Sequence, residues 1–171
     1  MIIGIKIFKN QIHKDNRGQF REIYKKKLLK SKELIFDCMS VSKKNVIRGL
    51  HIQVKNPQAK FLTVIKGRIF DVALDLRKNS KTFGKYFSIE LSLNNYSSIY
   101  IPEGFAHGFY TLDKENIIFY SCSNYRNKNN EVGILWNDKN ININWPTKNP
   151  VVSKKDNNNI SFKEYCKKYI T

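Results

Sequence analysis

The chain is poor in the residues that mark several protein classes. Its 171 residues include three cysteines, four prolines and eight glycines. Cys38, Cys122 and Cys166 are odd in number and form no Cys-x-x-Cys pair, so the sequence predicts neither a disulfide framework nor a zinc cluster. We interpret Cys38 and Cys122 as buried, unreactive thiols, because apolar residues surround them or alternate with them. The glycines follow no period, which excludes a collagen-like or linker architecture.

Long apolar segments are also absent. No stretch approaches the roughly 18 apolar residues that a membrane-spanning helix requires, and the opening MIIGIK meets a lysine too early for a signal peptide. Hydrophobic residues nevertheless make up 41% of the chain, which is enough to build a core. We therefore expect one cytoplasmic domain, spanning residues 1–171, without a membrane partner.

Acidic residues are scarce beside basic ones, 14 against 31, so the net charge is +17. Such a charge can indicate a protein that binds nucleic acid. However, 25 of the basic residues are lysine and only six are arginine, whereas nucleic-acid readers favour the bidentate guanidinium group. A small anionic substrate would benefit from the same positive field. We favour such a substrate over nucleic acid.

Short strands dominate the predicted secondary structure. Residues 61–65 and 69–76 flank Lys66-Gly67-Arg68, which predicts a hairpin. Further strands are expected at 86–91, 98–101, 108–112 and 117–123, and this spacing indicates an antiparallel sandwich or barrel. In the strand at 69–76, Asp71 and Asp75 lie opposite the apolar face, so their face lines a cavity or meets solvent.

Helical segments are few. Residues 161–170 carry aromatic side chains at helical spacing, which predicts a helix at the tail. The lysine- and leucine-rich residues 24–34 are a second, shorter candidate. The stretch 154–159 is polar and loop-like, and it is too short to divide domains.

Two of the three histidines stand in distinctive segments. His107 ends the segment 102–107, which fits the P-x-G-x-x-H element of the cupin double-stranded β-helix. His51 begins His-Ile-Gln, where metal-binding cupins carry H-x-H and then a glutamate. Here Gln53 replaces the second histidine and Lys60 lies close to the place of the glutamate. A cation at that place argues against a divalent metal ion, and we expect none.

Without a metal, these side chains suit proton transfer beside a carbonyl group. Histidine is a base that works near neutral pH, and lysine can stabilise the oxyanion of an enolate. His51 and Lys60 together therefore suit the abstraction of a proton α to a carbonyl. Tyr120 alternates with apolar residues on a predicted strand and could return a proton from the other face.

A series of motifs resembles the nucleotide-sugar 3,5-epimerases. The matching segments are DNRGQFRE (15–22), RGLHIQ (48–53), QAK (58–60), DVALDLR (71–77), SKTFG (80–84), PEGFAHGF (102–109), WND (136–138), WP (145–146) and SKKD (153–156). The resemblance implies an all-β cupin double-stranded β-helix, which is a jelly-roll barrel, with short peripheral helices. It also implies an enzyme without a cofactor, commonly a homodimer, that acts on a nucleotide-diphospho-4-keto-6-deoxy sugar.

The resemblance implies a role for each matching position. His51 matches the catalytic base, Asp156 the carboxylate that orients it, and Tyr120 the proton donor. Lys60 and His107 match contacts near the sugar carbonyl. The remaining matches to substrate contacts are Arg17, Glu22, Arg48, Gln53, Glu131, Lys155 and Tyr125, the last of which would stack on the nucleotide base.

Three positions depart from the family pattern. His13 stands where the family often has a phenylalanine against thymine, and Phe36-Asp37-Cys38 stands where it often has Gln-x-Asn. Ile52 replaces the usual aromatic residue after the catalytic histidine. A base other than thymine, or a different sugar, therefore remains an alternative.

The sequence thus predicts an epimerase that inverts C3, and with it C5, of a 4-keto sugar nucleotide during deoxysugar synthesis for a surface polysaccharide. The C4 carbonyl acidifies both neighbouring C–H bonds, so one base and one acid can serve both carbons. Inversion of C3 alone and 3,4-ketoisomerisation are the nearest alternatives. A sugar- or RNA-binding cupin without catalysis is an alternative from another class, but it does not explain the joint presence of a base, its carboxylate, a cation and a proton donor.

Overall fold

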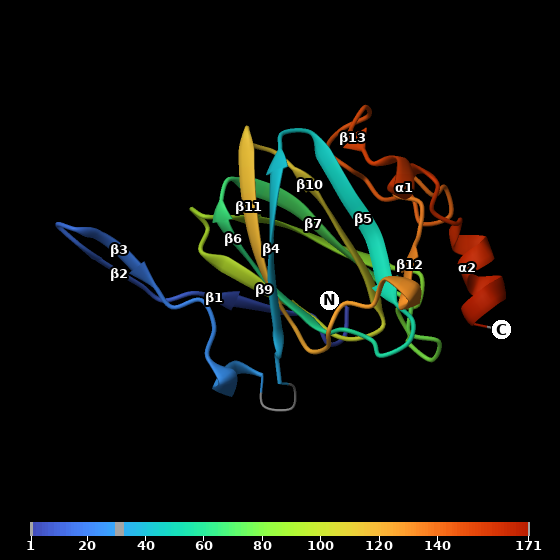
Figure 1. Cartoon of the computed structure of the whole chain (residues 1–171), viewed down its shortest axis with the longest axis horizontal. Coiled ribbons are helices and arrows are strands. Elements are labelled where there is room, and N and C mark those ends of the chain that lie inside the picture. The colour runs from blue at the N-terminus through green and yellow to red at the C-terminus, as the bar shows by residue number, and fades with distance from the viewer. Residues whose placement is uncertain (1, 30–32, 171) are drawn as a thin grey trace.

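The computed structural model describes residues 2–29 and 33–170, and two β-sheets form most of it (Figure 1). The first sheet has the order β1 (Lys6–Lys9), β9 (Ser97–Ile101), β6 (Lys60–Lys66), β11 (Glu115–Cys122) and β4 (Phe36–Lys43). The second has the order β12 (Glu131–Gly133), β5 (Val46–Gln53), β10 (Phe105–Thr111), β7 (Arg68–Asp75) and β8 (Tyr86–Ser92), with β13 (Val151–Val152) beside β5. The all-β class and the cupin-like jelly roll predicted from the sequence are confirmed.

The second sheet is buried on both faces. Its inner face packs Ile69 and Phe109 against Leu62 and Ile118 of the first sheet. Its outer face packs, through residues such as Leu74, against the C-terminal part of the chain. This two-sided burial explains why every residue of β10 is buried.

Asp71 and Asp75 therefore do not meet solvent, because the inner face of β7 is covered by the first sheet. Both side chains are completely buried. Asp71 accepts a hydrogen bond from His107, which lines a cavity, whereas Asp75 binds the loop that follows β7. The sequence predicted that this face lines a cavity or meets solvent. The first prediction holds for the surroundings of Asp71, whose partner His107 lines the cavity. Exposure to solvent is wrong for both side chains.

The predicted hairpin around Gly67 is wrong. Residues 61–65 and 69–76 do form strands, but β6 pairs with β9 and β11 while β7 pairs with β8 and β10. Leu62 of β6 and Ile69 of β7 instead share the core between the sheets. The positive φ of Gly67, 79°, allows the sharp turn, but the burial of both apolar faces decides which strands pair.

The helices are short and peripheral. The predicted tail helix is confirmed as α2 (Phe162–Tyr169), and a capping box between Ser161 and Glu164 begins it. The helix expected at 24–34 is reduced to one 3-10 turn, η1 (Lys26–Leu28), among the described residues, and positions 30–32 lie outside them. The stretch 154–159, expected to be a loop, begins with the helix α1 (Lys154–Asn157), because the Ser153 hydroxyl caps its N-terminus. A second 3-10 turn, η2 (Lys128–Asn130), precedes β12.

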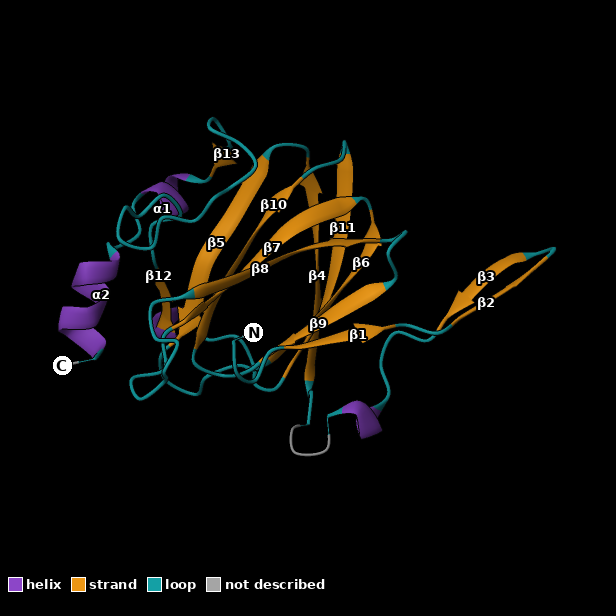
Figure 2. Cartoon of the chain, turned by 180° about the vertical axis from the view of Figure 1, so that it is seen from behind, coloured by secondary structure: helices purple, strands orange, loops and turns teal. Residues whose placement is uncertain are grey.

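A two-stranded hairpin, formed by β2 (Ile12–Asp15) and β3 (Gly18–Arg21), extends away from the two sheets. Figure 2 shows it on the side opposite to α2. Its Phe20 side chain is 64% exposed. Across the described ranges, no helix is long and apolar enough to cross a membrane.

Asp75 ties the end of β7 to the loop that follows it. Its carboxylate accepts hydrogen bonds from the Arg77 guanidinium group at 2.6 and 2.8 Å, from Ser80 Oγ at 2.5 Å and from Thr82 Oγ1 at 2.6 Å. Burial alone would raise the pKa of Asp75, but these donors outweigh burial and lower the pKa to about 2.

We predict that Asp75→Asn lowers the free energy of unfolding by about 2 kcal/mol at pH 7, the equivalent of its pKa shift. Because the folded pKa lies below the ordinary value of 3.8, the stabilisation is complete above about pH 4 and disappears as the pH falls towards 2. Urea unfolding of both proteins between pH 2 and 7 would measure this difference.

Asp113→Asn is the matched control, because the Asp113 side chain is 38% exposed and pairs with Arg68 at the surface. It should change the free energy of unfolding by less than about 1 kcal/mol. A pH-independent loss in Asp75→Asn would mean that its carboxylate charge is not the stabilising feature.

Candidate functional site

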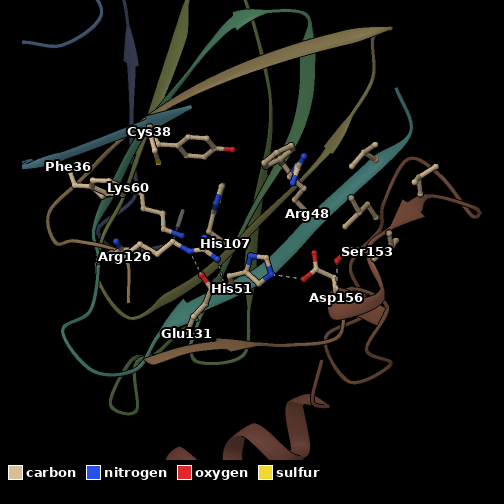
Figure 3. Close-up of a pocket in the computed structure, with 18 residues that line it drawn as sticks. Phe36, Cys38, Arg48, His51, Lys60, His107, Arg126, Glu131, Ser153 and Asp156 are labelled. Carbon is tan, nitrogen blue, oxygen red and sulfur yellow. Dashed lines mark hydrogen bonds and ion pairs between the residues drawn. The ribbon is translucent and has the colours of Figure 1, made fainter. Parts of the chain in front are cut away.

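A cavity of about 490 Å³ opens between the two sheets beside α1. Figure 3 shows side chains from both sheets and from α1 converging on it. The predicted site residues that line this cavity are His51, Lys60, Tyr120, Asp156, Arg48, His107 and Glu131. The structure thus brings together all four residues predicted to be catalytic.

Glycine allows the second sheet to present two histidines to the cavity. A Cβ atom on Gly49 would lie 2.6 Å from Gly108 Cα, so the close approach of β5 and β10 requires glycine there. The φ of Gly49 is +126°, and the pairing of these strands changes register between His107 and Phe109. Beyond this irregularity His51 lies directly opposite His107.

On the first sheet, regular alternation places side chains in the cavity. Tyr120 and Cys122 lie on β11, where they pair with Cys38 and Phe36 of β4, respectively. On the other side of β11, Cys122 pairs with Lys60 of β6. These five side chains lie on one face of the sheet, since residues that pair or are two apart share a face. All five line the cavity.

His51 is held by Asp156. Its Nε2 lies 2.7 Å from Asp156 Oδ1, and the backbone N–H of Gly49 donates to Asp156 Oδ2 at 3.3 Å. The carboxylate is fixed in turn because Ser153, which caps α1, accepts a hydrogen bond from the backbone N–H of Asp156. Burial would raise the pKa of Asp156, but the hydrogen bond and charge of His51 lower it overall. A carboxylate that stays ionised can orient the imidazole and stabilise its protonated form.

A second histidine–aspartate pair lies deeper in the cavity wall. His107 Nε2 lies 2.8 Å from Asp71 Oδ2, and the two side chains are 5% and 0% exposed. The sequence indicated His107 as a substrate contact but did not indicate its partner. Asp71 could have been found from its place in the matched segment DVALDLR together with its position among apolar neighbours.

Tyr120 and Lys60 are the other groups suited to proton transfer. The Tyr120 hydroxyl hydrogen-bonds the Ser40 hydroxyl at 2.9 Å, and its ring meets that of His107 edge to face, with the centroids 6.4 Å apart. Burial raises the pKa of Tyr120, so its hydroxyl keeps its proton at neutral pH. Burial lowers the pKa of Lys60, which brings its amine closer to proton exchange with a ligand.

Charged residues form the rim of the cavity. Glu131 binds both Arg126, at 2.9 Å, and Lys155. Burial would raise the pKa of Glu131, but these two cations lower it to about 2. Lys155 and Tyr125 do not line the cavity, although the Tyr125 ring lies 6.0 Å from that of Phe36, which does. Arg126 lines the cavity and was not predicted from the sequence.

Three of the predicted substrate contacts lie elsewhere. The Gln53 amide is used within the fold, because it donates to the carbonyls of Asn56 and Tyr125 and accepts from the N–H of Asn127. Arg17, whose side chain is 86% exposed, binds Asp15 on the β2–β3 hairpin. Glu22 follows that hairpin and pairs with Lys25 at a separate hollow. None of the three lines the cavity.

The interpretation of both pocket cysteines as buried is wrong for one of them. Cys122 is buried, but Cys38 is exposed. Cys38 lies on β4, which is the edge strand of its sheet. An edge strand has a neighbour on one side only, so the alternating pattern did not ensure burial.

Within residues 2–29 and 33–170, no three His, Cys, Asp or Glu side chains gather as metal ligands would. The side chains of the cavity that could bind a metal are its histidines and its thiols, and the cationic Lys60 lies between them. The expectation that the site works without a metal stays a prediction.

Comparison with known proteins gives one consistent family. The model of the dTDP-4-dehydrorhamnose 3,5-epimerase family matches residues 1–164. The dTDP-4-dehydrorhamnose 3,5-epimerase of Shigella flexneri is 43% identical, over 94% of this chain and 92% of that protein. That of Methanothermobacter thermautotrophicus is 40% identical, over 91% and 88% respectively. The crystal structure of the Legionella pneumophila epimerase with dTDP-4-keto-L-rhamnose has a TM-score of 0.89 and 36% identity, covering 93% of this chain and 88% of that one.

Proposed function

Since the chain belongs to the dTDP-4-dehydrorhamnose 3,5-epimerase family, we propose that it inverts C3 and C5 of a dTDP-4-keto-6-deoxy sugar, with His51 as the base. It is an isomerase-class enzyme of deoxysugar biosynthesis. The observation that carries the assignment of roles is the placement of a carboxylate-held histidine and a protonated tyrosine on opposite sheets around one cavity.

The first step is proton abstraction. His51 takes the proton from the carbon next to the C4 carbonyl, and Asp156 stabilises the imidazolium that forms. Negative charge then develops on the C4 oxygen. Lys60 and His107 both line the cavity, and in this proposal they hold the C4 oxygen and stabilise the enolate by charge and by hydrogen bonding.

The second step returns a proton from the other face. His51 belongs to β5 in the second sheet, and Tyr120 belongs to β11 in the first. A sugar ring between the sheets is therefore deprotonated from one side and protonated from the other, which inverts the carbon. Exchange with water then removes the proton from His51 and returns one to Tyr120. Rotation of the same 4-keto sugar brings the second acidic C–H bond to this pair, so C3 and C5 need no separate machinery.

The rim supplies cations for the nucleotide. Arg48 and Arg126 line the cavity, and Lys155 adjoins Arg126 through Glu131. Guanidinium groups bind the oxygens of a diphosphate in pairs. Phe36 and Tyr125 form an aromatic pair beside these cations, on which the nucleotide base can stack.

The protein acts as a homodimer in this proposal, and each hairpin serves the cavity of the other subunit. Arg17 and Glu22 match substrate contacts of the family but lie apart from the cavity of their own chain. The edge strand β4 exposes Met39 (61%) and Val41 (52%), and the hairpin exposes Phe20. A second copy would cover these apolar side chains and bring a hairpin to the site. Nucleic acid and membrane have no role in this proposal, and the cytoplasm supplies the substrate.

We predict that His51→Ala loses deuterium exchange into dTDP-4-keto-6-deoxyglucose in heavy water by about 10²–10⁴-fold, because the base is removed. Asp156→Asn should be impaired as well, since the imidazole loses the carboxylate that orients it. NMR would locate the exchanged carbons and so separate inversion at C3 and C5 from inversion at C3 alone.

Circular dichroism and thermal unfolding would show that both variants keep the fold. Exchange at the wild-type rate in a folded His51→Ala protein would contradict the assignment of the base.

We expect Tyr120→Phe to separate the two steps. The variant lacks only the hydroxyl, so His51 can still remove the proton and Lys60 can still hold the enolate. Exchange with retention should persist, while net inversion falls by about 10²-fold, the effect of losing one positioned acid. A time course in heavy water measures both. Equal loss of exchange and inversion would show that Tyr120 positions the substrate, and unchanged inversion would show that another group donates the proton.

Mixing two inactive variants tests the exchange of hairpins. If Arg17 acts in the partner subunit, a mixture of Arg17→Ala and His51→Ala proteins regains about a quarter of wild-type turnover. Half of the randomly formed dimers are then mixed, and each mixed dimer has one complete site. Light scattering should show a dimer. A dimer in which mixing restores nothing would mean that the hairpin does not complete the other subunit's site.

A further inference from the structure

Two cysteines lie side by side in the cavity, and the proton-transfer mechanism uses neither. Cys38 and Cys122 lie on the neighbouring strands β4 and β11, in diagonal positions, since Cys38 pairs with Tyr120 and Cys122 with Phe36. Both side chains line the cavity. Diagonal positions on neighbouring strands share one face of the sheet, so both thiols face the same side of the cavity.

The surroundings make these thiols unequal. Interaction with the neighbouring Cys122 thiol and the positive charges of Lys60 and Arg126 lower the pKa of Cys38 to about 7. Interaction with Cys38 and burial raise the pKa of Cys122. Cys38 is therefore substantially a thiolate at neutral pH, and a thiolate is the nucleophilic form of cysteine.

Access also differs between the cysteines. Cys38 is exposed on the edge strand β4, whereas Cys122 is buried on the next strand, β11. Cys166 lies on α2, away from the cavity, and burial raises its pKa. An oxidant that enters the cavity thus meets one accessible thiolate with a second thiol on the neighbouring strand, which is the arrangement of an attacking and a resolving cysteine.

We propose that Cys38 and Cys122 are a redox-active dithiol that a hydroperoxide converts to a disulfide inside the substrate cavity. The Cys38 thiolate attacks the terminal peroxide oxygen, the O–O bond breaks, and the product is a sulfenic acid with release of an alkoxide or hydroxide, which takes up a proton. The Cys122 thiol then attacks the sulfenic sulfur, the S–O bond breaks, and water leaves. The two thiols lose two electrons in total, and the peroxide gains them.

The strand positions predict that this disulfide is easily reduced. Diagonal residues on antiparallel strands lie farther apart than directly paired ones, so β4 must slide along β11 or twist locally to close the bond. An edge strand can make this shift because it has a partner on one side only. Disulfides that form with strain are the readily reduced ones. Dithiothreitol should therefore restore both thiols.

The position of the dithiol links it to substrate binding. Cys38 pairs with Tyr120, and Cys122 pairs with Lys60, both of which contact the sugar in the function proposed above. In this respect the inference rests on the proposed function. A bound sugar nucleotide would cover Cys38 and slow its oxidation.

Peptide mapping can test the pair directly. Trypsin places the three cysteines on separate peptides, 33–43, 115–126 and 164–167. We expect hydrogen peroxide to join the first two peptides with loss of two hydrogen atoms, and dithiothreitol to separate them, while 164–167 stays reduced. Iodoacetamide labelling of Cys38 should rise with pH around a midpoint near 7 and exceed that of Cys166 at pH 7.

Matched variants give the controls. Cys166→Ser should form the disulfide as the wild type does, whereas Cys38→Ser should not form it. Cys122→Ser should stop at the sulfenic acid of Cys38, which dimedone would trap. If wild-type protein yields only sulfenic or sulfinic acid at Cys38, or links either cysteine to Cys166, the proposed pair is wrong.

Added dTDP separates this inference from the proposed function. We expect saturating dTDP to slow disulfide formation at least about tenfold, because a covered thiolate is reached only after the ligand leaves. Calorimetry measures dTDP binding in parallel. Protein that binds no dTDP contradicts the proposed substrate. The disulfide can be detected without any substrate, so peptide mapping still tests the proposed dithiol in that case. Protein that binds dTDP without any protection contradicts the placement of the dithiol in the substrate site.

Discussion

Backbone contact between Gly49 on β5 and Gly108 on β10 positions both histidines of the cavity. Side chains at these positions would hold the two strands apart, since a Cβ atom on Gly108 would lie 2.8 Å from the carbonyl oxygen of Arg48. The contact also lets the backbone N–H of Gly49 reach Asp156. The positions of His51, Asp156 and His107 therefore depend on one pair of glycines.

The two histidine–aspartate pairs have similar geometry but different surroundings. The His51 side chain is 26% exposed, so its imidazole can reach a ligand in the cavity. His107 is almost fully buried, and its ring lies against those of Phe109 and Tyr120. A group that takes a proton from substrate has to be accessible, whereas a group that donates a fixed hydrogen bond gains from being held still. This difference supports separate roles for the two pairs.

The edge strand β4 combines three properties that follow from its place in the fold. Its inner face carries Phe36 and Cys38 into the cavity, and its outer face exposes Met39 and Val41. Its free side, among the described strands, leaves it able to shift. The same strand therefore contributes to the proposed base stacking, the proposed dimer and the proposed dithiol. Substitutions on β4 should be assigned to one face or the other before their effects are interpreted.

The sequence alone determined the strands from β6 to β11, the tail helix and the series of short motifs, because period-two alternation, helical spacing and the spacing of motifs are local properties. It also indicated His51, Lys60 and Asp156 through matched segments, and Tyr120 through its alternation on a predicted strand and its match to the proton donor of the family. Only the tertiary structure decided that β6 and β7 face each other across the core, since the pairing of strands depends on the burial of both sheets at once. It likewise placed Asp71 against His107, Cys38 diagonal to Cys122, and Arg17 outside the cavity, because each of these relations joins strands that are distant in the chain or not adjacent in the fold.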